Sequence, residues 1–128
     1  FFQLEGLMVD KDVSLAHMKG VLEYFFTRFF GGEVQVRFRP SFFPFVEPGV
    51  EVDMMIAPQE GNKLSGRWIE VMGAGMVHPN VLRAANIDPL VYQGFAFGMG
   101  IDRLGVLRYG IDDIRLMYNG DLRFVNQF

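Results

Sequence analysis

Hydrophobic and polar residues alternate near the start of the chain, as they do in a β-strand. In residues 1–9, Gln3 and Glu5 lie two positions apart and therefore share one face, while Leu4 points to the other face. No turn or cap precedes this strand. We therefore expect the chain to begin inside a domain, that is, to be truncated at its N-terminus.

A helix is predicted next, because the apolar positions change to helical spacing. Ser14 is a favourable N-cap, and the pair Gly31 and Gly32 is typical of a helix end. The residues that recur at intervals of three or four should form the buried stripe: Leu15, Met18, Leu22, Phe25 and Phe29.

Further strands are predicted in the middle of the chain. Alternation in residues 34–39 indicates a half-buried strand that stops at Pro40, and alternation in residues 50–56 indicates another strand after a bend rich in Phe and Pro. Residues 58–66 should form a polar loop. A short strand over residues 68–72 should end where glycines follow it.

The last part of the chain combines short helices with one strand. Residues 79–85 suit a short helix with Pro in its first turn, and residues 94–100 suit a strand that runs into a helix. The Asp pair at 112–113 and Asp121 are expected to cap two final turns. Because hairpin-length connections join most strands, we predict an α/β (α+β) domain with a mainly antiparallel sheet flanked by helices.

Composition narrows the class of protein. The 128 residues fit one domain, and half of them are hydrophobic, including 14 Phe, which suffices for a packed core. The mean hydropathy is slightly positive, so part of the apolar surface should face another segment or subunit. The absence of cysteine excludes disulfides and thiolate metal sites and agrees with a reducing, cytoplasmic setting.

Two further properties of the sequence exclude classes of partner. No apolar run is long enough to span a membrane. The net charge of −3 argues against a surface that grips nucleic acid as a whole, so any such contact must be local.

Two segments carry residues that suit an amino-acid or aromatic ligand. Gln3 and Glu5 could hold an ammonium group through an amide oxygen and a carboxylate, or could be an ordinary solvated strand face. In residues 42–48, prolines fix the backbone around aromatic rings, which suits a wall for a flat apolar ligand. The alternative for this segment is a bulged edge strand that packs on its own core.

Two other segments place small residues beside chemically active side chains. Glu70 could be a magnesium ligand or a strand-face charge, and His78 could bind a ligand or be satisfied by nearby backbone. Two histidines without cysteine argue against zinc. In residues 94–104, the glycines around Gly98 are a weak signal for a phosphate loop. Arg103, in the first turn of a helix, suits stacking on a base or contacting phosphate, or a surface ion pair.

Four segments together resemble one family. The run Gly-Phe-Ala-Phe-Gly-Met-Gly-Ile-Asp-Arg-Leu at 94–104 resembles motif 3 of class II aminoacyl-tRNA synthetases, in the form found in phenylalanyl-tRNA synthetase α subunits. Residues 1–7 resemble the second strand of that family's motif 2, and residues 39–48 and 73–79 also match. Family members usually carry a His at the position of Phe2, so no role of that His is transferred.

The resemblance implies a fold and a set of site residues. The fold is the class II synthetase catalytic fold, with residues 1–128 as its C-terminal portion, from the second motif 2 strand through motif 3. Phe1 and Arg103 would sandwich the adenine of ATP, Arg103 would act in catalysis, and Glu47 or Glu70 would bind Mg²⁺. Phenylalanine would be held by Gln3, Glu5, Phe43, Phe45, Val46, Ala74, Ala96 and Gly98.

The activity implied is ATP-dependent activation of L-phenylalanine and its transfer to tRNA(Phe). A larger α subunit would perform it with a β subunit, as an α2β2 heterotetramer in the cytoplasm. The catalytic arginine of motif 2 is expected before Phe1, so we expect this stretch alone to lack ATP–pyrophosphate exchange activity. Two alternatives remain: a non-catalytic synthetase-like module for binding or assembly, and another synthetase of the same subclass. The rings of Phe43 and Phe45 with the small Ala96 favour phenylalanine.

Overall fold

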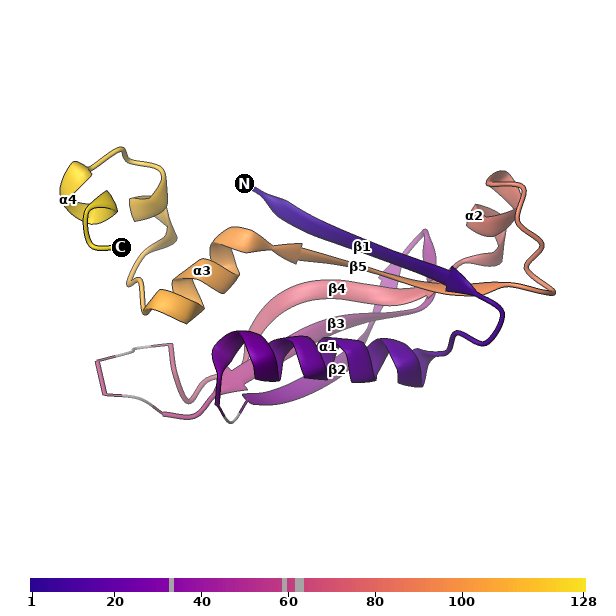
Figure 1. The fold of residues 1–128 in the computed structure, drawn as a ribbon, viewed down its shortest axis with the longest axis horizontal. Helices are drawn as coiled ribbons and strands as arrows, with labels where there is room; N and C mark the ends of the chain where they lie inside the picture. Colours follow the sequence, from indigo (N-terminus) through magenta and orange to yellow (C-terminus); the bar gives the residue numbers. More distant parts are fainter. Residues whose placement is uncertain (33, 59, 62–63) are drawn as a thin grey trace.

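Five strands in the described part of the chain form one antiparallel sheet (Figure 1). The computed structural model describes residues 1–32, 34–58, 60–61 and 64–128. The strand order is β1-β5-β4-β3-β2, and every neighbouring pair is antiparallel. The elements, in chain order, are β1 (Gln3–Asp10), α1 (Leu15–Phe30), β2 (Val34–Phe43), β3 (Val46–Ile56), β4 (Ile69–Val77), α2 (Pro79–Ala84), β5 (Gln93–Gly100), α3 (Ile101–Tyr109), the 3-10 helix η1 (Ile114–Met117) and α4 (Leu122–Val125).

The predicted antiparallel α+β architecture is confirmed, although hairpins are not its main cause. Among the described connections between consecutive strands, only the tight turn between β2 and β3 has the length of a hairpin. Helix α1 separates β1 from β2, α2 separates β4 from β5, and residues 57–68 separate β3 from β4. The predicted polar loop at 58–66 lies in this last connection, and its residues 59, 62 and 63 fall outside the described residues.

Helix α1 begins and ends where the sequence predicts. The Ser14 hydroxyl accepts a hydrogen bond from the His17 backbone N–H at 3.3 Å, and the His17 ring accepts one from the Ser14 N–H at 3.2 Å. Gly31 ends the helix in the left-handed conformation, with φ of 67°. Both contacts satisfy backbone groups that the helix itself leaves without a partner.

The buried stripe of α1 differs from the prediction in its second half. The fully buried residues are Met18, Leu22 and Phe26, which follow one row at intervals of four. Phe29, predicted to be buried, is 36% exposed, and Phe25 is partly buried. The prediction was wrong here because it followed a repeat of seven residues. On a straight α-helix, positions with this repeat rotate gradually around the axis, so the later ones no longer face the sheet.

The predicted end of β2 at Pro40 is also wrong. The strand continues to Phe43, and Pro40 pairs with Val50 on β3. Proline is tolerated because β2 is an edge strand, where a missing N–H need not break a ladder. The register shifts between Ser41 and Phe43, so the bulged edge strand considered as an alternative describes the backbone of this segment.

Strand β4 does not end at its glycines but runs through them to Val77. A Cβ atom on Gly73 would lie 3.0 Å from the ring of Phe43, and one on Gly75 would lie 2.6 Å from the carbonyl oxygen of Pro48. These glycines therefore allow close approach within the sheet, rather than terminating the strand.

The two faces of the sheet differ in character. Residues paired across neighbouring strands share a face. One row across the sheet is apolar and consists of Leu4, Met99, Met72 and Val52. The adjacent row on the opposite face is acidic or has no side chain, and consists of Glu5, Gly98, Gly73 and Glu51. Helix α1 packs its buried residues against the apolar face, which leaves the other face for a site (Figure 1).

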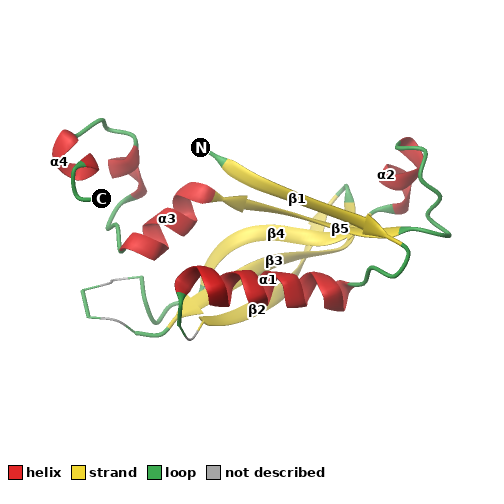
Figure 2. Ribbon diagram, viewed as in Figure 1, coloured by secondary structure: helices red, strands yellow, loops and turns green. Residues whose placement is uncertain are grey.

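The remaining helices lie at the ends of the sheet (Figure 2). Helix α3 follows β5 directly and ends at Gly110, which has a φ of 64°. As predicted, Asp113 caps η1 and Asp121 caps α4. Among the helices in the described part of the chain, none combines the length and the apolar run that a bilayer crossing requires.

Candidate active site

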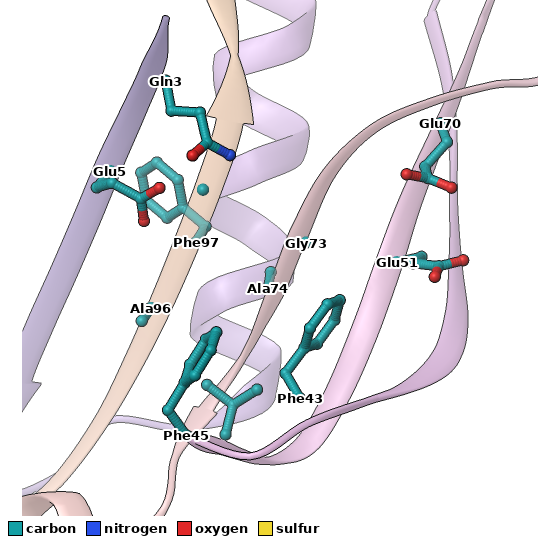
Figure 3. Close-up of a pocket in the computed structure, with 12 residues that line it drawn as sticks. Gln3, Glu5, Phe43, Phe45, Glu51, Glu70, Gly73, Ala74, Ala96 and Phe97 are labelled. Atoms are coloured by element: carbon teal, nitrogen blue, oxygen red, sulfur yellow. The ribbon is translucent and has the colours of Figure 1, made fainter. Parts of the chain in front are cut away.

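One cavity of about 320 Å³ lies on the face of the sheet opposite α1 (Figure 3). It is bordered by all of the residues predicted to hold phenylalanine, namely Gln3, Glu5, Phe43, Phe45, Val46, Ala74, Ala96 and Gly98. The volume falls in the range of small-molecule sites. Residues from the beginning, middle and end of the chain are thus brought together, as the prediction requires. We call this cavity the first pocket.

The polar end of the first pocket is formed by Gln3 and Glu5 on β1. Their side chains point the same way from the strand, toward the pocket (Figure 3). Gly98 lies opposite Glu5 in the β1–β5 register. A Cβ atom at Gly98 would lie 2.6 Å from Oε1 of Glu5, so the absence of a side chain makes room for this carboxylate. The pair offers hydrogen-bond acceptors and one negative charge to a bound cation.

The apolar end of the first pocket is formed by two stacked rings. The centroids of Phe43 and Phe45 are 6.1 Å apart, and the ring planes are inclined by 27°. Phe43 lies over Gly73, and the carbonyl of Phe45 accepts a hydrogen bond of 2.9 Å from the N–H of His78. The hairpin of β2 and β3 therefore holds both rings in place. The two alternatives considered for residues 42–48, a bulged edge strand and a wall of aromatic rings, are both features of this one segment.

Ala74 borders the first pocket, although it belongs to the core that α1 covers on the opposite face of the sheet. It pairs with Val50 and Phe97 and belongs to the buried core under the sheet. Gly73, one residue earlier, lies beneath the ring of Phe43. Sequence reasoning named Ala74 and missed Gly73, because the register that decides which of the two faces a ligand is not visible in a single strand.

A row of charged residues on β2 and β3 stands beside the first pocket. Asp53 is only 2% exposed, and it accepts hydrogen bonds from Arg39 at 2.6 and 2.8 Å and from Arg37 at 2.6 and 2.9 Å. These contacts, those of Arg39 above all, hold the pKa of the Asp53 carboxyl below its usual value. Arg39 also pairs with Glu51 at 2.9 Å, and Glu51 borders the pocket.

Sequence reasoning did not identify Glu51 or Asp53 as part of the site. Both alternate with apolar residues, as any solvated strand face does. One signal in the sequence could have identified them. Arg37 and Arg39 alternate on the preceding strand as Glu51 and Asp53 do on the next, and opposite charges on paired strands attract.

A second cavity of about 400 Å³ adjoins the first. It is bordered by Phe1 and Arg103, the residues predicted to sandwich adenine, and it shares four residues with the first pocket: Gln3, Glu70, Gly73 and Gly98. Arg103 donates a hydrogen bond of 2.7 Å to the carbonyl oxygen of Glu70, which holds the half-exposed guanidinium against β4. Its distance to the Glu70 carboxylate is 3.9 Å. We call this cavity the second pocket.

The two predicted magnesium ligands are placed differently. Glu70 borders both pockets and its side chain is half exposed, with Arg39 and Arg103 no closer than 3.7 and 3.9 Å. Glu47 is exposed and borders neither pocket. The described residues contain no group of three or more His, Cys, Asp or Glu side chains arranged around a metal. Glu70 can offer one carboxylate beside the second pocket, and Mg²⁺ is usually bound by one or two carboxylates together with substrate phosphates and water.

His78 has the structural role considered as the alternative. It is the N-cap of α2, and its Nδ1 accepts a hydrogen bond of 3.1 Å from the N–H of Asn80. It borders neither of the two pockets.

Comparison with known proteins defines the class to which this fold and site belong. The family model described as "tRNA synthetases class II core domain (F)" matches residues 1–128. The chain belongs to this family of class II tRNA synthetase core domains, and the predicted fold class is confirmed.

Curated relatives agree with the more specific resemblance to phenylalanyl-tRNA synthetase α subunits. Over its whole length the chain is 59% identical to the phenylalanine–tRNA ligase alpha subunits of Colwellia psychrerythraea and Pseudoalteromonas atlantica. It is 56% identical, over 133 aligned residues, to that of Francisella tularensis subsp. novicida. The chain spans 37% of the length of the first two relatives and 39% of the third.

Proposed function

We propose that this chain is part of the active site of a phenylalanine–tRNA ligase, where L-phenylalanine is activated with ATP and then transferred to tRNA(Phe). The observation that carries the proposal is the shared wall between the two pockets, formed by Gln3, Glu70, Gly73 and Gly98. An amino acid in the first pocket and a nucleotide in the second would be neighbours. Such placement makes a reaction between two bound molecules effectively unimolecular.

The first pocket suits phenylalanine at both ends. The amide oxygen of Gln3 and the carboxylate of Glu5 would accept hydrogen bonds from the ammonium group, and Phe43 and Phe45 would pack against the ring. Val46 and Ala96 border the first pocket and would close it beyond the ring's far end. A tyrosine hydroxyl buried there without a partner would lose about 1–3 kcal/mol, which supports phenylalanine as the substrate.

The second pocket suits ATP. The ring of Phe1 and the guanidinium of Arg103 would hold the adenine, and Arg103 would also stabilise negative charge during the reaction. The substrate carboxylate attacks the α-phosphorus, the bond to the β-phosphate oxygen breaks, and pyrophosphate leaves. No protein nucleophile is needed. Glu70 would hold a Mg²⁺ ion, which would neutralise phosphate charge.

The relatives support the wider setting of the proposal. They are named alpha subunits, so we infer that the full-length protein works with a β subunit, as an α2β2 heterotetramer in the cytoplasm. Residues 1–128 would form the C-terminal portion of its catalytic domain. The direct test is phenylalanine-dependent ATP–pyrophosphate exchange by the purified full-length α subunit with its β partner. Exchange stimulated by another amino acid, or by none, would contradict the proposal.

Ala96→Gly in this complete enzyme is expected to admit para-chlorophenylalanine. The change removes a methyl group that borders the first pocket, and a difference of one methyl or methylene is typically worth about 10–200-fold in discrimination. The measurement is the exchange rate with para-chlorophenylalanine relative to phenylalanine. Ala85→Gly, at an exposed position after α2, is the matched control and should leave this ratio at the parent's value. An unchanged ratio in Ala96→Gly would show that the placement of Ala96 at the ring's far end is wrong.

A further inference from the structure

A buried carboxylate that the proposed reaction does not use stands at the base of the second pocket. Asp102 lies in the first turn of α3 and is 6% exposed. Its Oδ2 accepts a hydrogen bond of 3.0 Å from the backbone N–H of Phe2, and its Oδ1 accepts one of 2.5 Å from the hydroxyl of Tyr118. Both oxygens of this side chain are therefore engaged, each by a different part of the chain.

These two contacts join three segments that meet only in the folded structure. Phe2 precedes β1, Asp102 lies in the first turn of α3, and Tyr118 follows η1 directly. The Ile101 N–H also donates a hydrogen bond of 3.0 Å to the carbonyl of Phe2, so the start of β1 is attached to α3 at two points. The hydrogen bond from Tyr118 and that from Phe2 hold the pKa of the Asp102 carboxyl below its usual value, so it is charged near neutral pH.

Each segment attached to Asp102 supplies a wall of the second pocket. Phe1 and Gln3 flank Phe2 at the start of β1, Arg103 follows Asp102 on α3, and Ile114 comes from η1. The backbone of Phe2, the residue next to Phe1, is held by Asp102 and by Ile101 at the start of α3. Asp102 therefore connects the Phe1 side of the second pocket to the helix that carries Arg103.

We propose that Asp102 is a positioning residue for the nucleotide: by binding the Phe2 N–H and the Tyr118 hydroxyl together, it sets the spacing between Phe1 and Arg103 across the second pocket. This role rests on the proposed function, because it assigns the second pocket to ATP. It differs from a general contribution to stability, because it concerns the second pocket and not the aromatic end of the first.

The test uses the full-length α subunit with its β partner and the variant Asp102→Asn. The amide keeps the size of the side chain but removes its negative charge. Its oxygen can still accept from the Phe2 N–H and its NH₂ group can donate to the Tyr118 hydroxyl, but both contacts lose the strength that the charge gives them. We expect KM for ATP to rise about 10-fold or more, while KM for phenylalanine changes much less. Titration calorimetry with a non-hydrolysable ATP analogue should show the same loss of affinity. A merely structural role would lower the Tm and the active fraction without separating the two KM values.

A second variant keeps the proposal testable if Asp102→Asn does not fold. Tyr118→Phe removes a single hydroxyl from a ring that is 53% exposed and leaves the carboxylate in place. It should also raise KM for ATP more than KM for phenylalanine, by a smaller factor. Tyr109→Phe, on α3 but packed against Phe128 at a centroid distance of 5.1 Å, is the matched control and should have no effect on either KM.

Two results would separate the failure of this inference from the failure of the proposed function. If the parent enzyme shows no phenylalanine-dependent exchange, the proposed function fails, and the role assigned here to Asp102 fails with it. If the parent is active and the folded variants keep the parent's KM for ATP, or raise both KM values equally, Asp102 is not a positioning residue for the nucleotide.

Discussion

Replacing Arg103 with alanine in the full-length enzyme is expected to lower kcat/KM for ATP by about 10²–10³-fold. The guanidinium is the positive group that α3 brings to the second pocket, and its hydrogen bond to the carbonyl of Glu70 fixes its position there. Removing it takes away both a stacking surface for the base and a fixed charge near the phosphates. The measurement is the ATP dependence of pyrophosphate exchange at saturating phenylalanine.

The control for this prediction is Arg123→Ala. Arg123 lies on α4, pairs with Asp121 at 2.8 Å and borders neither pocket. Loss of this exposed ion pair should leave the kinetics at the parent's values, because such pairs contribute little to stability. If Arg103→Ala has no more effect than Arg123→Ala, the second pocket is not the nucleotide site.

Gly98→Ala is expected to raise KM for phenylalanine by about 10–100-fold with little loss of stability. The new methyl group would lie 2.6 and 2.9 Å from the two carboxylate oxygens of Glu5. These atoms are the end of a flexible side chain, so the fold can adapt by moving them. The ammonium site then loses its charged acceptor. Exchange kinetics at saturating ATP measure the effect, and thermal unfolding shows whether the fold is retained.

Gly20→Ala provides the comparison for this substitution. Gly20 lies on α1, and a Cβ atom there would meet nothing within 4 Å. Alanine at this helix position should be neutral or stabilising and should not change KM. A Gly98→Ala enzyme with the parent's KM for phenylalanine would show that Glu5 does not hold the ammonium group where we place it.

The local signals in the sequence gave correct predictions where one segment determines the outcome alone. Ser14, Asp113 and Asp121 cap helices because their side chains reach backbone N–H groups only two or three residues away. Gly31 ends a helix because glycine adopts the left-handed conformation readily.

The predictions failed where a neighbouring strand decides the result. Pro40 was expected to end a strand, but it is tolerated because β2 lies at the edge of the sheet, and edge position depends on the whole topology. The glycines of β4 were expected to end a strand, but they make room for Phe43 and for the β3 backbone. Neither neighbour is recognisable from the segment itself.

The same distinction applies to the site. Gln3 and Glu5 could be assigned to one face from strand geometry alone, and the resemblance supplied the aromatic pair. Asp53 and Asp102 were missed because their roles come from partners on other elements. Asp53 depends on the register between β2 and β3, and Asp102 depends on a contact with Phe2.

The pairing of β1 with β5 joins the beginning of the chain to its last third, since Gln3 lies opposite Gly100. Closing so long a loop requires a large loss of chain entropy. The favourable contacts of this pairing form only when the intervening strands have assembled. Because both pockets contain residues of β1 and β5, any molecule that occupies them binds only after this closure. At a free concentration of 100 times its Kd, such a ligand would stabilise the closed state by about 2.7 kcal/mol.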